Sequence, residues 1–382
     1  MKIIHTGDWH IGKLVHGVHM TKDQEFILNE LVELIKKEKP KVMIIAGDIY
    51  DRSIPPVEAV ELLDKTLYQV LIENKVKIIA IAGNHDSPNR VAFGNKVFSS
   101  QGLYLSGEIN DKIKPIEIDN FRFYPIPFAE PAVIKERFNE KTIRSHDDTM
   151  KFLLDKIDLD EKYNNICIAH GFVTNSESIE KSDSVRPLSI GGTEYIDVSY
   201  FEKFDYVALG HLHKPQKVKH DYIRYSGSLL KYSFSEVNQK KSVTIVEFNE
   251  KDEFSYRQVN LKVKRDLKII ENTLDEIINN ANKINKEIDD YIKVVLTDKG
   301  NLIEPMAKLK QVFNNILKLE RNRQFVMDKN SNSSAKGDFK KKDKIELFEE
   351  FYNNISGDKL DEDKKSIVLK VLDEINKSKR RK

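Results

Sequence analysis

The sequence predicts a protein of the α/β class with two or three domains, as its length and two patterns indicate. Its 382 residues suffice for a large core, and 40% are apolar against 32% charged, as in globular proteins with highly charged surfaces. Over the first two thirds, short apolar runs alternate with segments of helical periodicity, which is typical of a layered α/β domain. After residue 220 the pattern turns to strands alone.

The charge balance and the cysteine content exclude some classes of protein. Because the net charge is only +2, any binding of nucleic acid depends on local basic patches. The single cysteine, Cys167, excludes a disulfide framework and fits a reducing compartment. The N-terminus, MKIIHTGDWH, is too short and too polar for a signal peptide, and no apolar run approaches a membrane span. We therefore expect a cytoplasmic protein.

The individual elements follow from the spacing of apolar residues. Apolar, β-rich runs predict strands over residues 2–6, 41–47, 76–83, 164–171, 205–211, 223–228, 240–250 and 254–263. Helical spacing predicts helices over residues 24–40 and 57–74, each between two of the first three strands. These elements together form a first domain, 1–262.

A smaller α+β domain is predicted over residues 263–327, within the usual size range of a domain. It is expected to hold a helix, a strand and a second helix, over residues 267–283, 290–298 and 306–321. Residues 328–344 have almost no apolar content and predict a flexible linker. Two helices follow in residues 345–382.

Each of these C-terminal helices has one apolar face, which two short helices cannot bury by themselves. The faces consist of Ile345, Phe348, Phe351, Tyr352 and Ile355, and of Ile367, Val368, Val371, Leu372 and Ile375. The helices either dock back on their own chain or bind a partner, and both alternatives stay open. In the second case the contact residues are expected to be Phe348, Phe351, Tyr352, Val368, Val371 and Leu372.

The first five predicted strands all end in side chains that bind metals. These residues are, in chain order, Asp8 and His10, Asp48 and Asp51, Asn84 and His85, His170, and His211 and His213. Ligands bind at the carboxyl ends of strands in open α/β sheets, so we expect these side chains to converge. A single D-x-H or H-x-H pattern is more often structural, whereas five such strand ends indicate a site.

The residue types indicate two divalent metal ions. Carboxylate, amide and imidazole donors suit Mn²⁺, Fe²⁺ or Zn²⁺, and Asp48 can bridge two ions with its two oxygens. Two ions roughly 3.5–4 Å apart can activate a water and hold the oxygens of a phosphate. His85 is then free to contact the phosphate or to protonate the leaving oxygen. Asp51 is expected to hydrogen-bond that imidazole and to orient it.

Five motifs narrow the prediction to a family. HTGDWHIGK, GDIYDRSIPP, AGNHDSPNR, GHLHKPQ and YSGSLLKYSFSE together resemble the calcineurin-like metallophosphoesterase superfamily and, within it, the SbcD family of nuclease subunits of bacterial SbcCD complexes. The resemblance extends from residue 1 to the C-terminal helices. It implies a two-sheet sandwich flanked by helices around a dinuclear site.

The resemblance also implies roles for the residues. One metal would be held by Asp8, His10, Asp48 and His213, and the second by Asp48, Asn84, His170 and His211. His85 matches the family's catalytic histidine. The family uses Mn²⁺ and acts on DNA as a 3′→5′ double-strand exonuclease and single-strand endonuclease that opens hairpins, in DNA repair, recombination and replication.

The same resemblance implies partners. The small second domain would cap the nuclease and place DNA, and the C-terminal helices would bind the coiled coil of an SbcC-type ATPase. Family members also pair with each other, which would give a heterotetramer with the ATPase. Candidate DNA contacts are Lys13, His16, Arg52 and Arg90, with basic clusters at 261–268 and 377–382.

Two other functions are compatible with these motifs. A phosphatase or cyclic-nucleotide phosphodiesterase can use the same metal core, although a small-molecule hydrolase needs no partner-binding helices. A mainly architectural protein would dimerise and brace an ATPase, although the complete set of metal ligands argues against catalytic silence.

Overall fold

The computed structural model describes residues 1–175, 182–185, 188, 194–250, 253–284, 289–298, 301–322, 343–356 and 359–379. The chain divides into two compact units, Met1–Lys268 and Ile269–Lys382. This boundary lies a few residues beyond the one expected from the sequence. None of the helices in these ranges has the length and apolar content that a membrane span requires.

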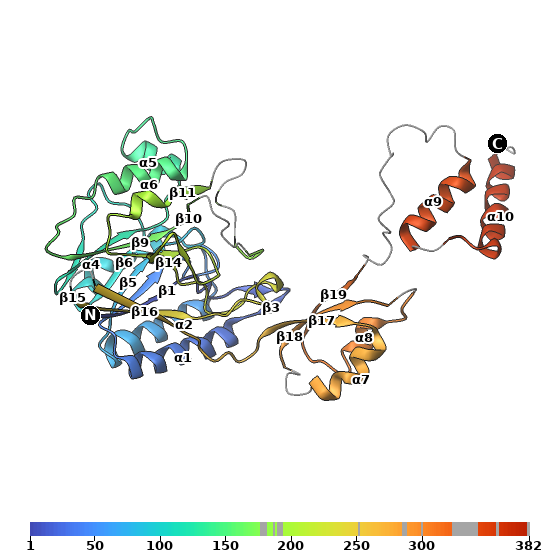
Figure 1. Ribbon diagram of the computed structural model, residues 1–382, viewed down its shortest axis with the longest axis horizontal. Coiled ribbons are helices and arrows are strands. Elements are labelled where there is room, and N and C mark those ends of the chain that lie inside the picture. The colour runs from blue at the N-terminus through green and yellow to red at the C-terminus, as the bar shows by residue number, and fades with distance from the viewer. Residues whose placement is uncertain are drawn as a thin grey trace. The chain divides into compact units, whose positions relative to one another are not determined.

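The first sheet of unit 1 has the strand order β16-β15-β1-β4-β5-β6, and five of these strands, all but β4, are labelled in Figure 1. Its strands are β1 (Lys2–Thr6), β4 (Val42–Ala46), β5 (Lys77–Ile81), β6 (Leu103–Ser106), β15 (Val243–Glu250) and β16 (Glu253–Val259). The first four are parallel, and β15 and β16 extend the sheet in antiparallel pairing. All of β4 is buried, since a central parallel strand is covered on both faces.

The second sheet has the order β13-β14-β12-β9-β8-β7. Its strands are β7 (Ile116–Ile118), β8 (Phe121–Ile126), β9 (Asn164–His170), β12 (Tyr206–Gly210), β13 (Gln216–Val218) and β14 (His220–Tyr225). Strands β8, β9, β12 and β14 run parallel. The predicted α/β fold with two sheets is therefore confirmed.

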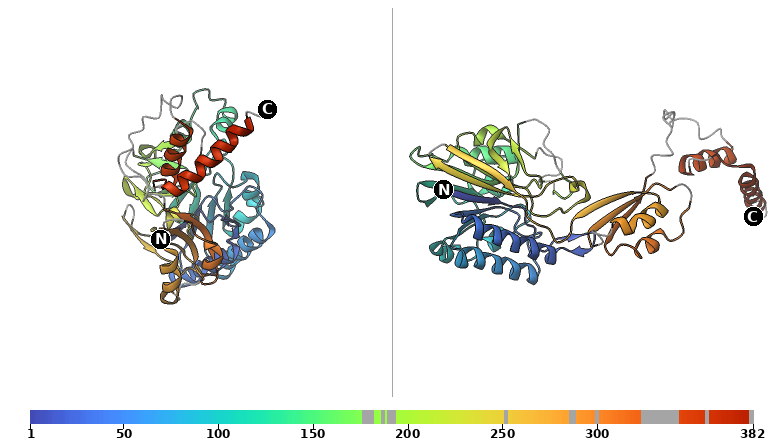
Figure 2. Two further views of the ribbon diagram at one scale, coloured as in Figure 1. Left: turned by 90° about the vertical axis from the view of Figure 1, so that its right-hand side faces the viewer. Right: turned by 60° about the horizontal axis from the view of Figure 1, so that its bottom comes forward.

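Two apolar cores organise the layers of unit 1. One lies between the sheets and joins residues such as Ile44 and Ile79 of the first to Phe123 and Ile168 of the second. The other lies on the far side of the second sheet, under α5 (Pro131–Arg137) and α6 (His146–Asp155). Helices α1 (Thr21–Glu38) and α2 (Val57–Tyr68) lie on the opposite side of the sandwich (Figure 2).

Shorter elements connect these layers. They are two small sheets, β2 (Leu14–Val15) with β3 (Val18–His19) and β10 (Phe172–Thr174) with β11 (Tyr195–Asp197); the helices α3 (Pro88–Val91) and α4 (Asn95–Phe98); the π turn η1 (Gln69–Glu73); and the 3-10 turns η2 (Ser99–Gln101), η3 (Val198–Phe201) and η4 (Phe234–Glu236). The π turn continues α2 to Glu73, one residue before the end of the predicted helix 57–74.

Unit 2 corrects two of the predicted helices. The segment 267–283 begins as strand β17 (Leu267–Asn272) before α7 (Leu274–Ile284), and 306–321 contains α8 (Pro305–Leu309) and then β19 (Ile316–Arg321). These strands flank the predicted strand β18 (Tyr291–Leu296) in a three-stranded sheet. Pairing with β18 overrides the helical spacing of their apolar residues.

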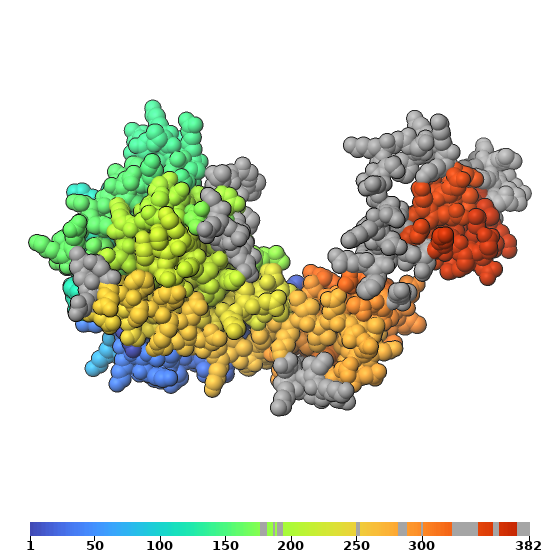
Figure 3. Space-filling view, viewed as in Figure 1, coloured from blue at the N-terminus to red at the C-terminus, as the bar shows by residue number. Residues whose placement is uncertain are grey.

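The C-terminal helices are α9 (Lys344–Ser356) and α10 (Glu362–Lys379). Lys365 Nζ lies 2.7 Å from the Glu349 carboxylate and links the two helices, which form one continuous surface (Figure 3). The predicted linker, residues 328–344, lies outside the described residues except for its last two positions.

Candidate metal centre

The strand-end side chains meet at one edge of the two packed sheets. The loops after β1 and β4 are joined by main-chain bonds, from Asp8 N to Gly47 O (3.0 Å) and from His10 N to Asp48 O (2.9 Å). The loop after β12 joins them because His211 N donates to Asp8 Oδ1 at 2.8 Å. The structure thus brings together all seven predicted ligands, three of them from the second sheet.

The backbone at this edge is strained. Asp8, His10, Asp48 and His211 have positive φ angles of 52°, 46°, 49° and 109°. Such conformations cost free energy and cluster at functional sites, where the surrounding structure enforces them. At Gly83, a Cβ atom would lie 2.2 Å from Asp48 Oδ1, so only glycine leaves room for that carboxylate.

Asp8, His10 and His213 form the first group of donors, with ligand atoms within 4.8 Å of one another. His10 Nε2 and His213 Nε2 face each other at 3.0 Å. Asp8 Oδ2 is buried without a hydrogen-bond partner, which is costly for a carboxylate oxygen. An unpaired oxygen beside two converging nitrogens is what a cation site requires.

Asp48, His170 and His211 form the second group. Asp48 Oδ2 lies 3.5 Å from His170 Nε2 and 3.6 Å from His10 Nε2, so this carboxylate stands between the two groups. Asn84 Oδ1 lies 3.0 Å from His170 Nε2 and 3.2 Å from His211 Nδ1. Oxygen and imidazole donors around a shared carboxylate fit two divalent metal ions.

Burial shapes the protonation of these groups. Burial, together with the nearby Asp48 charge, raises the pKa of Asp8 to about 8. Burial also opposes the charge of Asp48, yet the charge of the neighbouring His170 and its hydrogen bond to this carboxylate hold the pKa of Asp48 well below its ordinary value. Burial lowers the pKa of His10, His211 and His213. These imidazoles are therefore neutral at pH 7, as metal ligands must be.

His85 lies at the rim, half-buried, beside His10, with the two ring centroids 4.7 Å apart. Its Nδ1 donates to the main-chain carbonyl of Asp51 at 2.8 Å, not to the carboxylate that the sequence suggested. The Asp51 carboxylate instead accepts from Lys13 Nζ at 2.6 Å. The carbonyl holds the His85 ring with Nε2 free for a substrate.

Asp86 joins the loops after β4 and β5. Its carboxylate accepts main-chain hydrogen bonds from Ile49 (3.0 Å), Tyr50 (2.9 Å) and Gly83 (2.9 Å). The loop that carries Asp48 is thereby tied to the loop that carries Asn84 and His85. The sequence assigns Asp86 to the GNHD motif but does not reveal this bridging role.

Gln24 supports the first loop, and no motif in the sequence indicates it. This buried side chain on α1 accepts from Gly12 N at 2.9 Å and donates to His10 O at 2.7 Å and to Tyr232 OH at 3.0 Å. Its only signal in the sequence is a polar residue on the apolar face of a helix.

The predicted DNA contacts surround the centre unevenly. Lys13 and Asp51 pair directly beside His10. Arg52 is exposed in the loop after β4, and Arg90 is exposed on the short helix α3 that follows Asn84 and His85. His16 lies in the β2–β3 turn, with its ring centroid 5.4 Å from that of Phe234.

In the basic cluster 261–268, Arg265 pairs with the buried Asp23 at 3.1 Å, and Asp266 with Lys231 at 2.9 Å. In the cluster 377–382, residues 380–382 lie outside the described residues.

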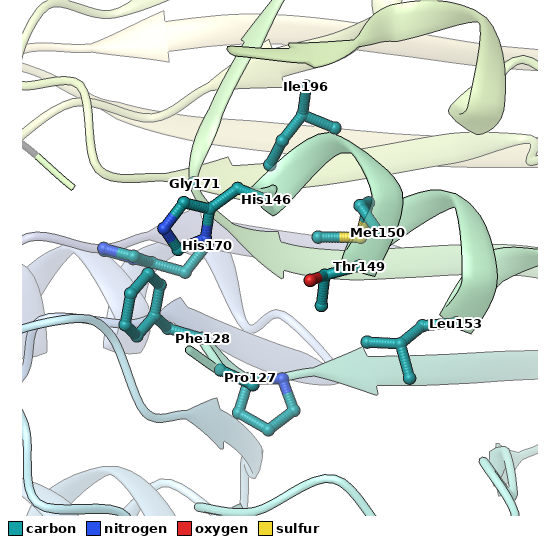
Figure 4. Close-up of a pocket in the computed structure, with 10 residues that line it drawn as sticks. Pro127, Phe128, His146, Thr149, Met150, Leu153, His170, Gly171 and Ile196 are labelled. Atoms are coloured by element: carbon teal, nitrogen blue, oxygen red, sulfur yellow. The ribbon is translucent and has the colours of Figure 1, made fainter. Parts of the chain in front are cut away.

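A small cavity is lined in part by His170 (Figure 4). Its other walls include Phe128, His146, Met150 and Ile196. The room inside is about that of one water molecule, far too little for a nucleotide base.

The predicted partner-binding face remains accessible on α9 and α10. Phe348, Phe351 and Val371 are 37%, 58% and 50% exposed, and Tyr352, Val368 and Leu372 are half-buried. These exposed apolar side chains leave the face open to contact with another molecule.

Comparisons with known proteins agree with this geometry. Residues 1–215 match the family model for calcineurin-like phosphoesterases, and residues 263–355 match that for the type 5 capsule protein repressor C-terminal domain. The SbcD component of nuclease SbcCD from Staphylococcus epidermidis is 38% identical over 93% of this chain and 94% of its own length. Its counterpart in Staphylococcus saprophyticus is 36% identical over 97% and 98%. Among solved structures, a dimetal phosphatase from Danio rerio matches 69% of this chain and 99% of its own at 10% identity, with a TM-score of 0.35.

Proposed function

The chain belongs to the calcineurin-like phosphoesterase family and is a metal-dependent nuclease, and on this premise we propose that it processes DNA ends and hairpins. It acts as a 3′→5′ double-strand exonuclease and as a single-strand endonuclease, in DNA repair, recombination and replication. The observation that carries this proposal is the seven-donor centre with His85 free at its rim. The staphylococcal relatives, both named as SbcCD nucleases, support a nucleic acid as the substrate.

The two donor groups hold two Mn²⁺ ions in this proposal. Asp8, His10, Asp48 and His213 bind the first, and Asp48, Asn84, His170 and His211 bind the second. When bound, the ions activate a water and neutralise the charge of the phosphate oxygens.

The chain's own side chains complete the chemistry. The Asp51 carbonyl keeps the proton of His85 on Nδ1, so protonation of Nε2 makes this ring an acid for the leaving oxygen. Lys13 lies 2.6 Å from Asp51 and supplies a cation near the scissile phosphate. Arg52, in an exposed loop, and Arg90, exposed on α3, contact the flanking phosphates.

The exposed face of α9 and α10 binds the coiled coil of an SbcC-type ATPase. The relatives' names, which assign them to an SbcCD complex, support this partner, and so do the exposed side chains of Phe351 and Val371. Residues 263–327 cap the nuclease domain and place DNA, and two copies of the chain pair to give a heterotetramer with the ATPase.

Cleavage of linear duplex and hairpin DNA with Mn²⁺ tests the nuclease proposal. The wild-type chain should cut both, and His85→Ala should lose about 10²- to 10⁴-fold in rate while still binding two Mn²⁺ ions. His220→Ala is the matched control, because this half-buried histidine contacts Glu202 and Tyr222 instead of the centre. Full activity of His85→Ala would refute the assigned role.

The same preparation separates the rival functions. A phosphatase or cyclic-nucleotide phosphodiesterase would hydrolyse bis(p-nitrophenyl) phosphate or cyclic AMP faster than it cuts DNA. An architectural protein would bind two Mn²⁺ ions and cut none of these substrates, even with the ATPase partner and ATP present.

A further inference from the structure

A buried polar cluster lies directly behind the ligand His213. Glu236 ends the turn η4 and is 0% exposed. Lys241 stands before β15 with only 5% of its side chain exposed, and the half-buried Ser184 completes the cluster. Burying an acid and a base this deeply is costly, and such groups are often retained for a specific role.

The hydrogen bonds of this cluster converge on one nitrogen. His213 Nδ1 lies 2.7 Å from Ser184 Oγ and 3.2 Å from Glu236 Oε1. The Ser184 hydroxyl also contacts Glu236 Oε1. An ionised carboxylate only accepts, so the hydroxyl donates its single hydrogen to Glu236. His213 Nδ1 therefore carries a proton and donates it to this pair.

This arrangement decides what the other nitrogen can do. With its proton on Nδ1, the neutral ring presents the lone pair of Nε2, which faces His10 Nε2 at 3.0 Å. A metal-binding imidazole commonly donates its second N–H to a carboxylate, which sets the tautomer and the ring orientation.

Lys241 stabilises the buried carboxylate in the folded state. Its Nζ lies 2.5 Å from Glu236 Oε2 and donates to the His213 main-chain carbonyl at 2.8 Å. The ammonium neutralises Glu236 and, through the carbonyl, fixes the backbone of the ligand itself. The cluster thus holds both the ring and the main chain of His213.

We propose that Ser184, Glu236 and Lys241 are positioning residues that hold His213 in the tautomer and orientation one metal site needs. This inference rests on the proposed role of His213 as a ligand of the first metal. It assigns to the cluster control of the first site alone, because its contacts reach none of Asn84, His170 and His211.

Calorimetric titration of the full-length, metal-stripped chain with Mn²⁺ tests this assignment. Ser184→Ala and the double variant Glu236→Leu, Lys241→Met should each weaken one of two binding events about 10- to 100-fold and leave the other unchanged. The double variant removes both buried charges together, so that no unpaired buried charge is left to destabilise the protein. Electron paramagnetic resonance distinguishes a single bound Mn²⁺ from two magnetically coupled Mn²⁺ ions. At metal concentrations between the two dissociation constants of a variant, the signal of the coupled pair should be lost.

Asp23→Asn is the matched control. Asp23 is likewise a buried carboxylate paired with a cation, Arg265, but it contacts no ligand. Both binding events should keep their affinity in this variant. If they weaken, the effect of the cluster variants is a general one of buried charge, and the inference falls.

The remaining outcomes separate this inference from the proposed function. Unchanged binding in the cluster variants, or equal weakening of both events, would overturn the positioning role and leave the nuclease proposal intact. Failure of the wild type to cut DNA, with selective weakening in the variants, would overturn the nuclease details and support the positioning role.

Discussion

At the scale of single residues, main-chain carbonyls fix the orientation of imidazole rings in the centre. His170 donates from Nδ1 to Ala46 O at 2.9 Å while its Nε2 faces the other predicted metal ligands. His85 is held by the Asp51 carbonyl in the same way. Little rotamer freedom is left for metal binding to remove. Rigid ligands held by further hydrogen bonds give a preorganised site.

The hydrogen bond from His85 leads to a prediction for Asp51. Because the carbonyl and not the carboxylate orients the ring, Asp51→Asn should lower kcat for DNA cleavage by less than about tenfold, far less than removal of the His85 acid. The loss should come from the broken contact with Lys13. Rates for Asp51→Asn and His85→Ala under the same conditions check this. Equal losses would show that the carboxylate does orient His85.

His5 makes the stability of the protein depend on pH. It is fully buried between Tyr206 OH (2.9 Å) and Leu209 O (3.2 Å), and burial lowers its pKa to about 3. The unfolded chain takes up a proton below about pH 6.5 and the folded chain does not. The stabilisation is therefore complete above pH 6.5 and is lost as the pH falls toward 3.

Urea unfolding of the metal-stripped chain at pH 7 and pH 5 measures this effect. His5→Gln has no group to titrate here, so its free energy of unfolding should fall by about 2 kcal/mol less than that of the wild type between the two pH values. An identical fall in both proteins would mean that the His5 ring is already protonated in the folded state.

At the scale of elements, the centre depends on how closely the strand ends approach. A Cβ atom at Gly47 would lie 2.3 Å from His170 Nδ1, whereas one at Gly17 would meet nothing within 4 Å. Both glycines have similar positive φ angles, 89° and 83°. Alanine at either position therefore carries the same backbone strain, roughly 1–2 kcal/mol.

This pair of glycines yields a matched experiment. Gly47→Ala should displace His170 and remove at least one of the two Mn²⁺ binding events, while Gly17→Ala should only lower Tm by a few degrees. Mn²⁺ titration beside thermal unfolding distinguishes the two effects. Intact binding by Gly47→Ala would show that His170 is not needed where the structure places it.

The sequence predicted the strands that end in ligands because each combines a buried apolar run with a motif at its end. It missed β17 and β19 because LKIIEN and ILKLER are short, and only their pairing with β18 decides their conformation. The sequence did not predict the supporting roles of Gln24 and Glu236 for a related reason. Each acts through contacts with residues distant in the sequence, which no local pattern records.

At the scale of the whole molecule, each unit has its own core. The core of unit 2 draws on residues from Ile270 to Leu319, and among the side chains that the structure describes it contains none of α9 or α10. Removing the C-terminal helices should therefore leave unit 1 and the core of unit 2 folded.

Deletion of residues 344–382 tests this separation of roles. The shortened chain should keep its Tm and its Mn²⁺-dependent cleavage but lose binding to a purified SbcC-type ATPase, measured by size-exclusion chromatography. Phe351→Asp should weaken the same complex within the full-length chain, because it places a charge on the exposed apolar face. Undiminished binding by both variants would place the partner surface elsewhere.

The two-sheet origin of the donors has one more consequence. Asp8, Asp48 and Asn84 follow strands of the first sheet, and His170 and His211 end or follow strands of the second, so a cation bound here cross-links the two layers. Free energy of metal binding is then also free energy of sheet association. Metal affinity therefore depends on how the two sheets are aligned. A conservative substitution at Ile44 or Ile168 in the inter-sheet core should change the affinity of the centre for its cations, although neither side chain belongs to the ligand set.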